Sequence, residues 1–103
     1  MTIIEEILEE RKRQDAKWGV QNHNIINYKE ANHLQYYGLP SELTAKFNCE
    51  NAAKEGNLTW GDIVVEELVE ALNAKNYKDM REELIQCGAV ILAMIESLDR
   101  NGK

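Results

Sequence analysis

The chain has 103 residues, of which 44% are hydrophobic, and a formal net charge of −6. A chain of this length forms one domain with a small core, so we expect a single domain over residues 1–103. The negative charge argues against nucleic acid and anionic membranes as partners, because phosphate contact needs clustered Lys and Arg side chains.

The first predicted helix follows Thr2, a residue that commonly caps a helix N-terminus. Its apolar residues recur at helical spacing and form one stripe, with most of the acidic side chains facing outward. These apolar residues are Ile3, Ile4, Ile7 and Leu8. Acidic residues precede basic ones along the helix, which suits the helix dipole. Gly19 is expected to end the helix.

A long loop is expected over residues 20–38, where polar residues, Asn and Tyr dominate without a sustained period. A short helix is expected within it, around residues 28–37. Ser41 then caps a second helix that runs to about residue 55 and ends at Gly56. The inward side of this helix is expected to carry Leu43, Phe47, Ala52 and Ala53.

A third helix is expected over about residues 60–75, where Thr59 and Asp62 resemble a capping box and Asn76 ends the helix. A fourth is expected over about residues 78–100. Its apolar stripe consists of Met80, Leu84, Cys87, Ile91, Ile95 and Leu98. Between residues 87 and 95 it is apolar on all sides, so we expect it to be the most buried element.

The predicted fold class is therefore all-α and resembles a four-helix bundle, with a long loop after the first helix. Three amphipathic neighbours of this size leave apolar surface of the fourth helix uncovered. We expect that surface to pair with further copies of the chain, as a homodimer or homotetramer.

The first residues have neither the basic flank nor the apolar run of a signal peptide. The longest apolar stretch, residues 87–95, is about half the length of a bilayer crossing. Cys49 and Cys87 fall inside predicted helices and are expected to be isolated thiols. We therefore expect a cytoplasmic protein.

Two acidic clusters lie on the third and fourth predicted helices. At about 100° per residue, Glu67 and Glu70 are about 60° apart on one helix face. Glu83 and Gln86 share one side of the next helix, in line with apolar residues. If the two helices pair antiparallel, three carboxylates and one carboxamide converge, and oxygen ligands of this kind suit Mg²⁺ or Mn²⁺. The same spacing also occurs on helix faces that are simply solvated.

This pattern resembles that of the MazG-like all-α nucleoside triphosphate pyrophosphohydrolases, in which Glu-x-x-Glu is followed by Glu-x-x-Asp. Here Glu67-Leu68-Val69-Glu70 is followed by Glu83-Leu84-Ile85-Gln86, so the last position departs from the pattern. Residues 13–23, 58–60 and 81–82 are also similar. The resemblance is to the small single-domain members found in phage and bacterial genomes, and it covers most of the chain outside residues 24–37.

The resemblance implies Mg²⁺-dependent cleavage of a (deoxy)nucleoside triphosphate to the monophosphate and pyrophosphate. The residues that it implies as metal ligands are Glu67, Glu70, Glu83 and Gln86. Glu66 or one of the ligands, such as Glu67, would orient the attacking water. Gln86 can offer an oxygen but brings no charge, so metal affinity is expected to fall or one metal to be lost.

Five residues are candidates for substrate contact. Trp18, beside Lys17, has the position to stack on a base, and it is equally suited to anchoring the first helix. His23 is a candidate for a hydrogen bond to base or phosphate, and Lys54 and Arg81 for phosphate contact. Each of these three is also typical of a solvated surface.

Two other kinds of function remain open. A helical protein that binds nucleotide or metal without turnover is compatible with the neutral Gln86. A purely structural dimerisation bundle, with its acidic pairs facing solvent, is compatible with the spacing alone.

Overall fold

The structure is a computed structural model that describes residues 1–27 and 33–102. The described residues form helices and no strand, so the predicted all-α class is confirmed. The helices are α1 (Ile3–Trp18), α2 (His33–Tyr36), α3 (Glu42–Lys54), α4 (Trp60–Leu72) and α5 (Tyr77–Asn101). The short helix predicted around residues 28–37 corresponds to α2 in its second half, and residues 28–32 lie outside the described residues. Over the described ranges, no helix has both the length and the apolarity that crossing a membrane requires.

The helix starts follow the capping residues. Glu5 N–H donates to Thr2 Oγ1, and Thr2 N–H donates back to the Glu5 carboxylate, each over 3.1 Å. Thr59 and Asp62 make the same reciprocal pair of bonds at the start of α4. Ser41 Oγ accepts from Thr44 N–H at the start of α3. A cap of this kind contributes about 1 kcal/mol, which explains why these three predicted starts are confirmed.

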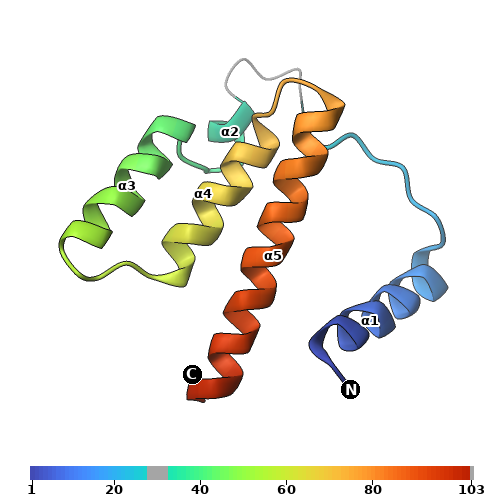
Figure 1. Cartoon of the computed structure of the whole chain (residues 1–103). Coiled ribbons are helices and arrows are strands. Elements are labelled where there is room, and N and C mark those ends of the chain that lie inside the picture. The colour runs from blue at the N-terminus through green and yellow to red at the C-terminus, as the bar shows by residue number, and fades with distance from the viewer. Residues whose placement is uncertain (28–32, 103) are drawn as a thin grey trace.

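The turn between α4 and α5 differs from the prediction. The helix α4 ends at Leu72, three residues earlier than the expected residue 75. Asn76 does not end α4 but caps α5, because its side-chain oxygen accepts from Asp79 N–H over 2.9 Å. The result is a short turn that reverses the chain and sets α4 and α5 antiparallel (Figure 1).

The core is centred on α4, which lies between α3 and α5 (Figure 1). Val69 and Ala71 on α4 are fully buried, and Val69 packs in one cluster with Leu34 and Ala45. The prediction that the fourth helix is the most buried element is wrong. On α5 only Cys87 is buried, because α5 packs closely against α4 alone, whereas α4 is covered from two sides.

The inward face predicted for α3 is confirmed only at Ala52, and it is wrong at Leu43, Phe47 and the exposed Ala53. Leu43 and Phe47 are 79% and 62% exposed. The face toward α4 instead carries Ala45, which is buried, with Cys49 and Ala52 partly buried. These three recur at intervals of four and three residues, so they share one helix face. Small side chains allow α3 and α4 to approach closely.

The helix α1 stands apart from the other helices in Figure 1 and packs lightly against α5. The predicted stripe is present, but none of its residues is buried within one chain. The radius of gyration is 15.7 Å, whereas a compact domain of this length has one of about 13 Å. A single chain therefore does not form a closed bundle.

Candidate metal centre

Three glutamates from two helices meet at one place. Oxygens of Glu67 and Glu70 on α4 and of Glu83 on α5 all lie within 4.8 Å of one another, and each of the three residues is partly buried. Within residues 1–27 and 33–102, no other group of three His, Cys, Asp or Glu side chains is close enough to hold a metal. The predicted convergence of these carboxylates is therefore confirmed, and metal binding by them stays a prediction.

The convergence follows from the local fold. Glu67 and Glu70 are one turn apart on α4, so both point to the same side. Glu83 lies in the second turn of α5, just after the reversal of the chain, and the antiparallel packing of α4 and α5 brings it level with them (Figure 1). The fully buried Val69 fixes the rotation of α4 between the two glutamates.

Two of the carboxylate oxygens lack partners. Glu67 Oε2 and Glu83 Oε2 are both buried, and neither accepts a hydrogen bond. Ion pairs in the described part of the chain are confined to α1, so no Lys or Arg neutralises the three carboxylates. A buried carboxylate oxygen without a donor or counter-ion is strongly destabilising. An oxygen-seeking divalent cation would satisfy both atoms, so the residues present fit Mg²⁺ or Mn²⁺.

The crowding of negative charge raises carboxyl pKa values. Burial, followed by the charges of Glu83 and Glu66, raises the pKa of Glu67 above its ordinary value. The pKa of Glu70 is raised from 4.5 to about 7, first by burial, then by nearby carboxylates, and also by a hydrogen bond with Glu83. In the metal-free protein near neutral pH, a proton on Glu70 thus reduces the repulsion among the three carboxylates. A bound cation would reduce the same repulsion. Cation binding is therefore expected to release this proton.

The two thiols, Cys49 on α3 and Cys87 on α5, are free, as predicted. Cys49 Sγ donates to the Asp62 carbonyl oxygen over 3.1 Å, and burial and then the charge of Glu66 raise its pKa. Burial and then the charge of Glu67 raise the pKa of Cys87. Both thiols therefore stay protonated at neutral pH, which does not suit ligation of a soft metal.

Two cavities border Glu70, and Lys46 on α3 lines both of them. The first, of about 600 Å³, is bounded by α3, the turn after α4 and the start of α5, and includes Glu83. The second, of about 420 Å³, lies over α3 and α4 and includes Glu66 and Cys49. Lys46 is therefore a cation beside the carboxylates that the sequence analysis missed. Its helix has no spacing relation to α4 or α5, so only the fold reveals it.

The candidate substrate residues lie elsewhere in a single chain. Trp18 is exposed at the end of α1, and Lys17 Nζ lies 4.8 Å above its ring. His23, Lys54 and Arg81 are also exposed. None of the five lines either cavity beside Glu70. The chain by itself does not bring them to the carboxylates, and their role in substrate contact stays a prediction.

Gln86 is exposed, so the prediction that it faces inward with Glu83 is wrong for the single chain. The side of α5 that packs on α4 is marked by the buried Cys87. Glu83 lies about 40° from Cys87 around the helix, whereas Gln86 lies about 100° away. Gln86 therefore lies outside the face of α5 that contacts α4. The cluster consists of three carboxylates and does not include the carboxamide of Gln86.

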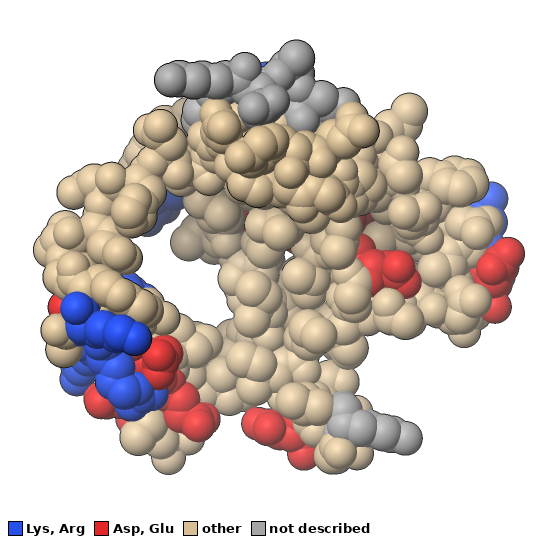
Figure 2. Space-filling model, turned by 180° about the vertical axis from the view of Figure 1, so that it is seen from behind, with Lys and Arg blue, Asp and Glu red and all other residues tan. Residues whose placement is uncertain are grey.

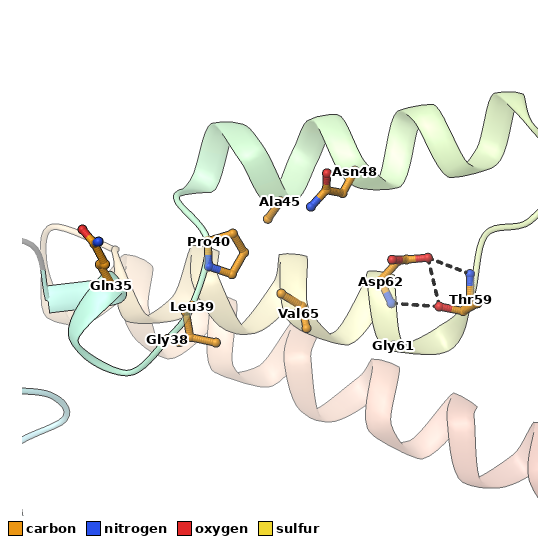
Figure 3. A pocket seen from close by; sticks show the side chains of 10 residues that line it. All are labelled: Gln35, Gly38, Leu39, Pro40, Ala45, Asn48, Thr59, Gly61, Asp62 and Val65. Carbon is orange, nitrogen blue, oxygen red and sulfur yellow. Dashed lines mark hydrogen bonds between the residues drawn. The ribbon is translucent and has the colours of Figure 1, made fainter.

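A larger cavity of about 720 Å³ lies away from the carboxylates, between α3 and the first half of α4 (Figure 3). Leu39, Pro40, Ala45 and Val65 supply much of its lining. Asp62 is the acidic side chain among the described residues that line it, and it accepts hydrogen bonds from Thr59 in the α4 cap. This carboxylate is therefore used structurally.

No family model, no curated protein and no solved structure matches the chain. Its function has therefore to be inferred from the carboxylate cluster and from the sequence pattern around it.

Proposed function

We propose that this protein is a Mg²⁺-dependent nucleoside triphosphate pyrophosphohydrolase of the cytoplasm, which releases a nucleoside monophosphate and pyrophosphate. The observation that carries the proposal is the meeting of Glu67, Glu70 and Glu83 with two buried oxygens left without partners. The resemblance of their spacing to the MazG-like pattern supports the reaction and the substrate class.

The three carboxylates would hold the cation, Mg²⁺ or alternatively Mn²⁺. When bound, a divalent cation neutralises charge on phosphate oxygens and lowers the pKa of an attacking water. Glu66 precedes the first ligand, is partly buried and lines the smaller cavity. Because Glu66 is outside the three-carboxylate cluster, it is the residue best placed to orient a water and accept its proton. The main role of Glu67 is then to bind the cation rather than to activate the water.

Lys46 is the lysine that the two cavities share, whereas Lys75 lines only the first of them. It lines both cavities that border Glu70, so a triphosphate that reaches the cation from either cavity passes its ammonium group. A lysine contributes to phosphate binding as a point charge on a flexible stem. We therefore assign to Lys46 a contact with the substrate's phosphates.

The Lys46→Ala variant is expected to raise KM for the triphosphate about tenfold and to change kcat less, because it removes one charge-assisted contact made in the bound state. Initial-rate kinetics at saturating Mg²⁺ measure this. Lys78→Ala is the matched comparison, since Lys78 is also an exposed helical lysine but lines neither cavity. A KM change in Lys78→Ala as large as that in Lys46→Ala contradicts the assignment.

A second candidate function is binding of a metal or nucleotide without turnover. It is favoured by Gln86, which is neutral and exposed where the MazG-like pattern has an aspartate. A site with one acidic ligand fewer than the MazG-like pattern can still bind a cation. It can nevertheless lack the negative charge that is needed to hold the metal for the reaction.

A substrate panel separates the two functions. Each common ribo- and deoxyribonucleoside triphosphate is incubated with Mg²⁺ or Mn²⁺, with and without inorganic pyrophosphatase, and free phosphate is measured. The proposal predicts phosphate release only when pyrophosphatase is present, because the first product is pyrophosphate. If no triphosphate is cleaved while calorimetry still shows Mn²⁺ binding, the second function holds instead.

A further inference from the structure

The two cavities that border Glu70 differ in how much of the carboxylate cluster they reach. Lys46 and Glu70 line both of them, so each cavity opens beside the cluster. The first cavity, of about 600 Å³, also includes Glu83 and therefore borders two of the three proposed cation ligands. The second cavity, of about 420 Å³, borders one of them. A ligand in the first cavity thus meets more of the proposed cation site than a ligand in the second.

Hydrocarbon forms much of the lining of the second cavity. Its apolar lining residues are Cys49, Ala53, Leu58 and Ile63. Leu58 is 41% exposed and Ile63 is only partly buried, so both leave apolar surface that a ligand can cover. Pockets for small molecules combine such apolar walls with a few polar groups. An uncharged, flat group such as a nucleobase suits this lining.

The charges around the second cavity do not favour phosphate. Among the described residues that line it, Lys46 is the one base, and it is shared with the first cavity. Glu50 and Glu66 line only the second cavity and repel a phosphate group. The Cys49 thiol stays protonated and donates to the Asp62 carbonyl oxygen, so it adds no charge. The second cavity therefore favours the uncharged part of a nucleotide.

The first cavity can take phosphate when a divalent cation is present. Lys75 adds a second ammonium group beside that of Lys46, and Asn73 adds a side-chain amide. The acidic residues that line the same cavity are Glu42, Glu70, Asp79, Glu82 and Glu83. The two lysines do not balance these carboxylates, so bare pyrophosphate is repelled. A cation between carboxylate and phosphate oxygens reverses this repulsion.

The two lysines are free to contact phosphate. On the face of the molecule that Figure 2 shows, the largest group of Lys and Arg side chains lies on α1. Arg11, Lys12 and Arg13 there are already paired with acidic residues of the same helix. Neither Lys46 nor Lys75 belongs to the ion pairs of residues 1–27 and 33–102. Their ammonium groups are therefore available to a ligand in the first cavity.

We propose that the nucleoside part of the triphosphate lies in the second cavity, against Leu58 and Ile63, and that its β- and γ-phosphates lie in the first, beside Lys75. Lys46 then contacts the phosphates where the two cavities meet. This orientation rests on the proposed function, because it takes a nucleoside triphosphate as the ligand. It assigns substrate contacts to residues that the sequence pattern does not mark. It also means that the two products occupy different cavities.

Calorimetry with the two products tests the orientation without requiring turnover. The probes are the common ribo- and deoxyribonucleoside monophosphates and inorganic pyrophosphate, each in the presence of Mn²⁺. Ala53→Trp fills the second cavity, so the affinity for monophosphate is expected to fall at least about tenfold, and that for pyrophosphate to stay unchanged. Lys75→Ala removes a charge-assisted contact, so it is expected to weaken pyrophosphate binding about tenfold and to leave monophosphate binding unchanged.

Asn51→Trp is the matched control for the tryptophan variant, since Asn51 is also exposed on α3 but lines neither cavity. It is expected to bind both products as the wild type does. A wild-type protein that binds no monophosphate overturns the orientation, as does an Ala53→Trp variant that keeps its monophosphate affinity. If such a variant accompanies cleavage in the substrate panel, the proposed function stands without this orientation. If the two variants behave as expected and no triphosphate is cleaved, the orientation stands and the proposed function fails.

A measurement on the wild type keeps the test decisive if circular dichroism shows that Ala53→Trp has lost helix. Cys49 lines the second cavity and not the first. Saturating monophosphate is therefore expected to nearly abolish alkylation of this thiol by iodoacetamide, whereas pyrophosphate with Mn²⁺ leaves its rate unchanged. Mass spectrometry of the Cys49 peptide measures the rate, and the buried Cys87, outside both cavities, is the internal control. Equal alkylation with and without monophosphate contradicts the orientation, as does protection by pyrophosphate alone.

Discussion

The Glu67→Gln variant is expected to release pyrophosphate at least about a hundredfold more slowly than the wild type and to bind Mn²⁺ at least about tenfold more weakly. The carboxamide keeps the shape of the side chain but removes the charge that the cation needs. Without metal, the same variant is expected to unfold at a higher temperature, because Glu67 Oε2 is buried without a partner and its charge raises the pKa of Glu70.

Loss of activity together with a higher melting temperature shows that the variant has lost a metal ligand, because a damaged fold would lower both activity and melting temperature. Glu96→Gln is the matched control, since Glu96 is exposed on α5 and lies outside the cluster. It is expected to leave activity, Mn²⁺ affinity and melting temperature unchanged. Coupled phosphate release, calorimetry and thermal circular dichroism measure the three quantities. A Glu67→Gln variant that retains wild-type Mn²⁺ affinity contradicts the assignment of Glu67 as a ligand.

The metal-free protein is expected to lose stability as pH rises from 5 to 8. Glu70 binds its proton more tightly in the folded state, where its pKa is about 7, than in the unfolded chain, where it is 4.5. The stability that this proton contributes is complete below pH 4.5 and is lost as pH rises through 7. The loss is at most ~3 kcal/mol, which corresponds to a fall of about 14 °C in the melting temperature. Glu67, with its raised pKa, adds to the loss in the same direction.

Addition of Mg²⁺ or Mn²⁺ at pH 8 is expected to restore the lost stability, because the cation replaces the proton. At pH 5 the same addition is expected to have little effect. The Glu70→Gln variant has no proton to lose at this position, so its melting temperature is expected to depend far less on pH. Thermal denaturation at both pH values, with metal and with a chelator, measures these differences. A wild-type melting temperature that is equal at pH 5 and pH 8 without metal contradicts this account of Glu70.

Three helix starts were predictable because they depend on local chemistry. Thr2, Ser41 and Thr59 each bond to a backbone group three residues ahead, and this is a property of a short stretch of sequence. The meeting of the three carboxylates was predictable for a similar reason. It needs only the helical period and a tight antiparallel turn between two consecutive helices.

The inward faces depend on what packs against each helix, which the residue types do not determine. Phe47 is apolar and nevertheless exposed, because α3 meets α4 through Ala45 and its small neighbours. Leu84 and Ile91 belong to the stripe that marked α5 as the most buried helix, yet α4 covers only the adjoining side. Lys46 reaches the site from a third helix, so no spacing along the chain indicated it.

Diffraction from crystals grown with Mn²⁺ determines whether one divalent cation is held between α4 and α5. Anomalous scattering is expected to give one strong peak about 2.1 Å from carboxylate oxygens of Glu67, Glu70 and Glu83. Crystals grown at saturating Mn²⁺ and alkaline pH that show these three carboxylates without a peak, or turned apart into solvent, would contradict a cation site there.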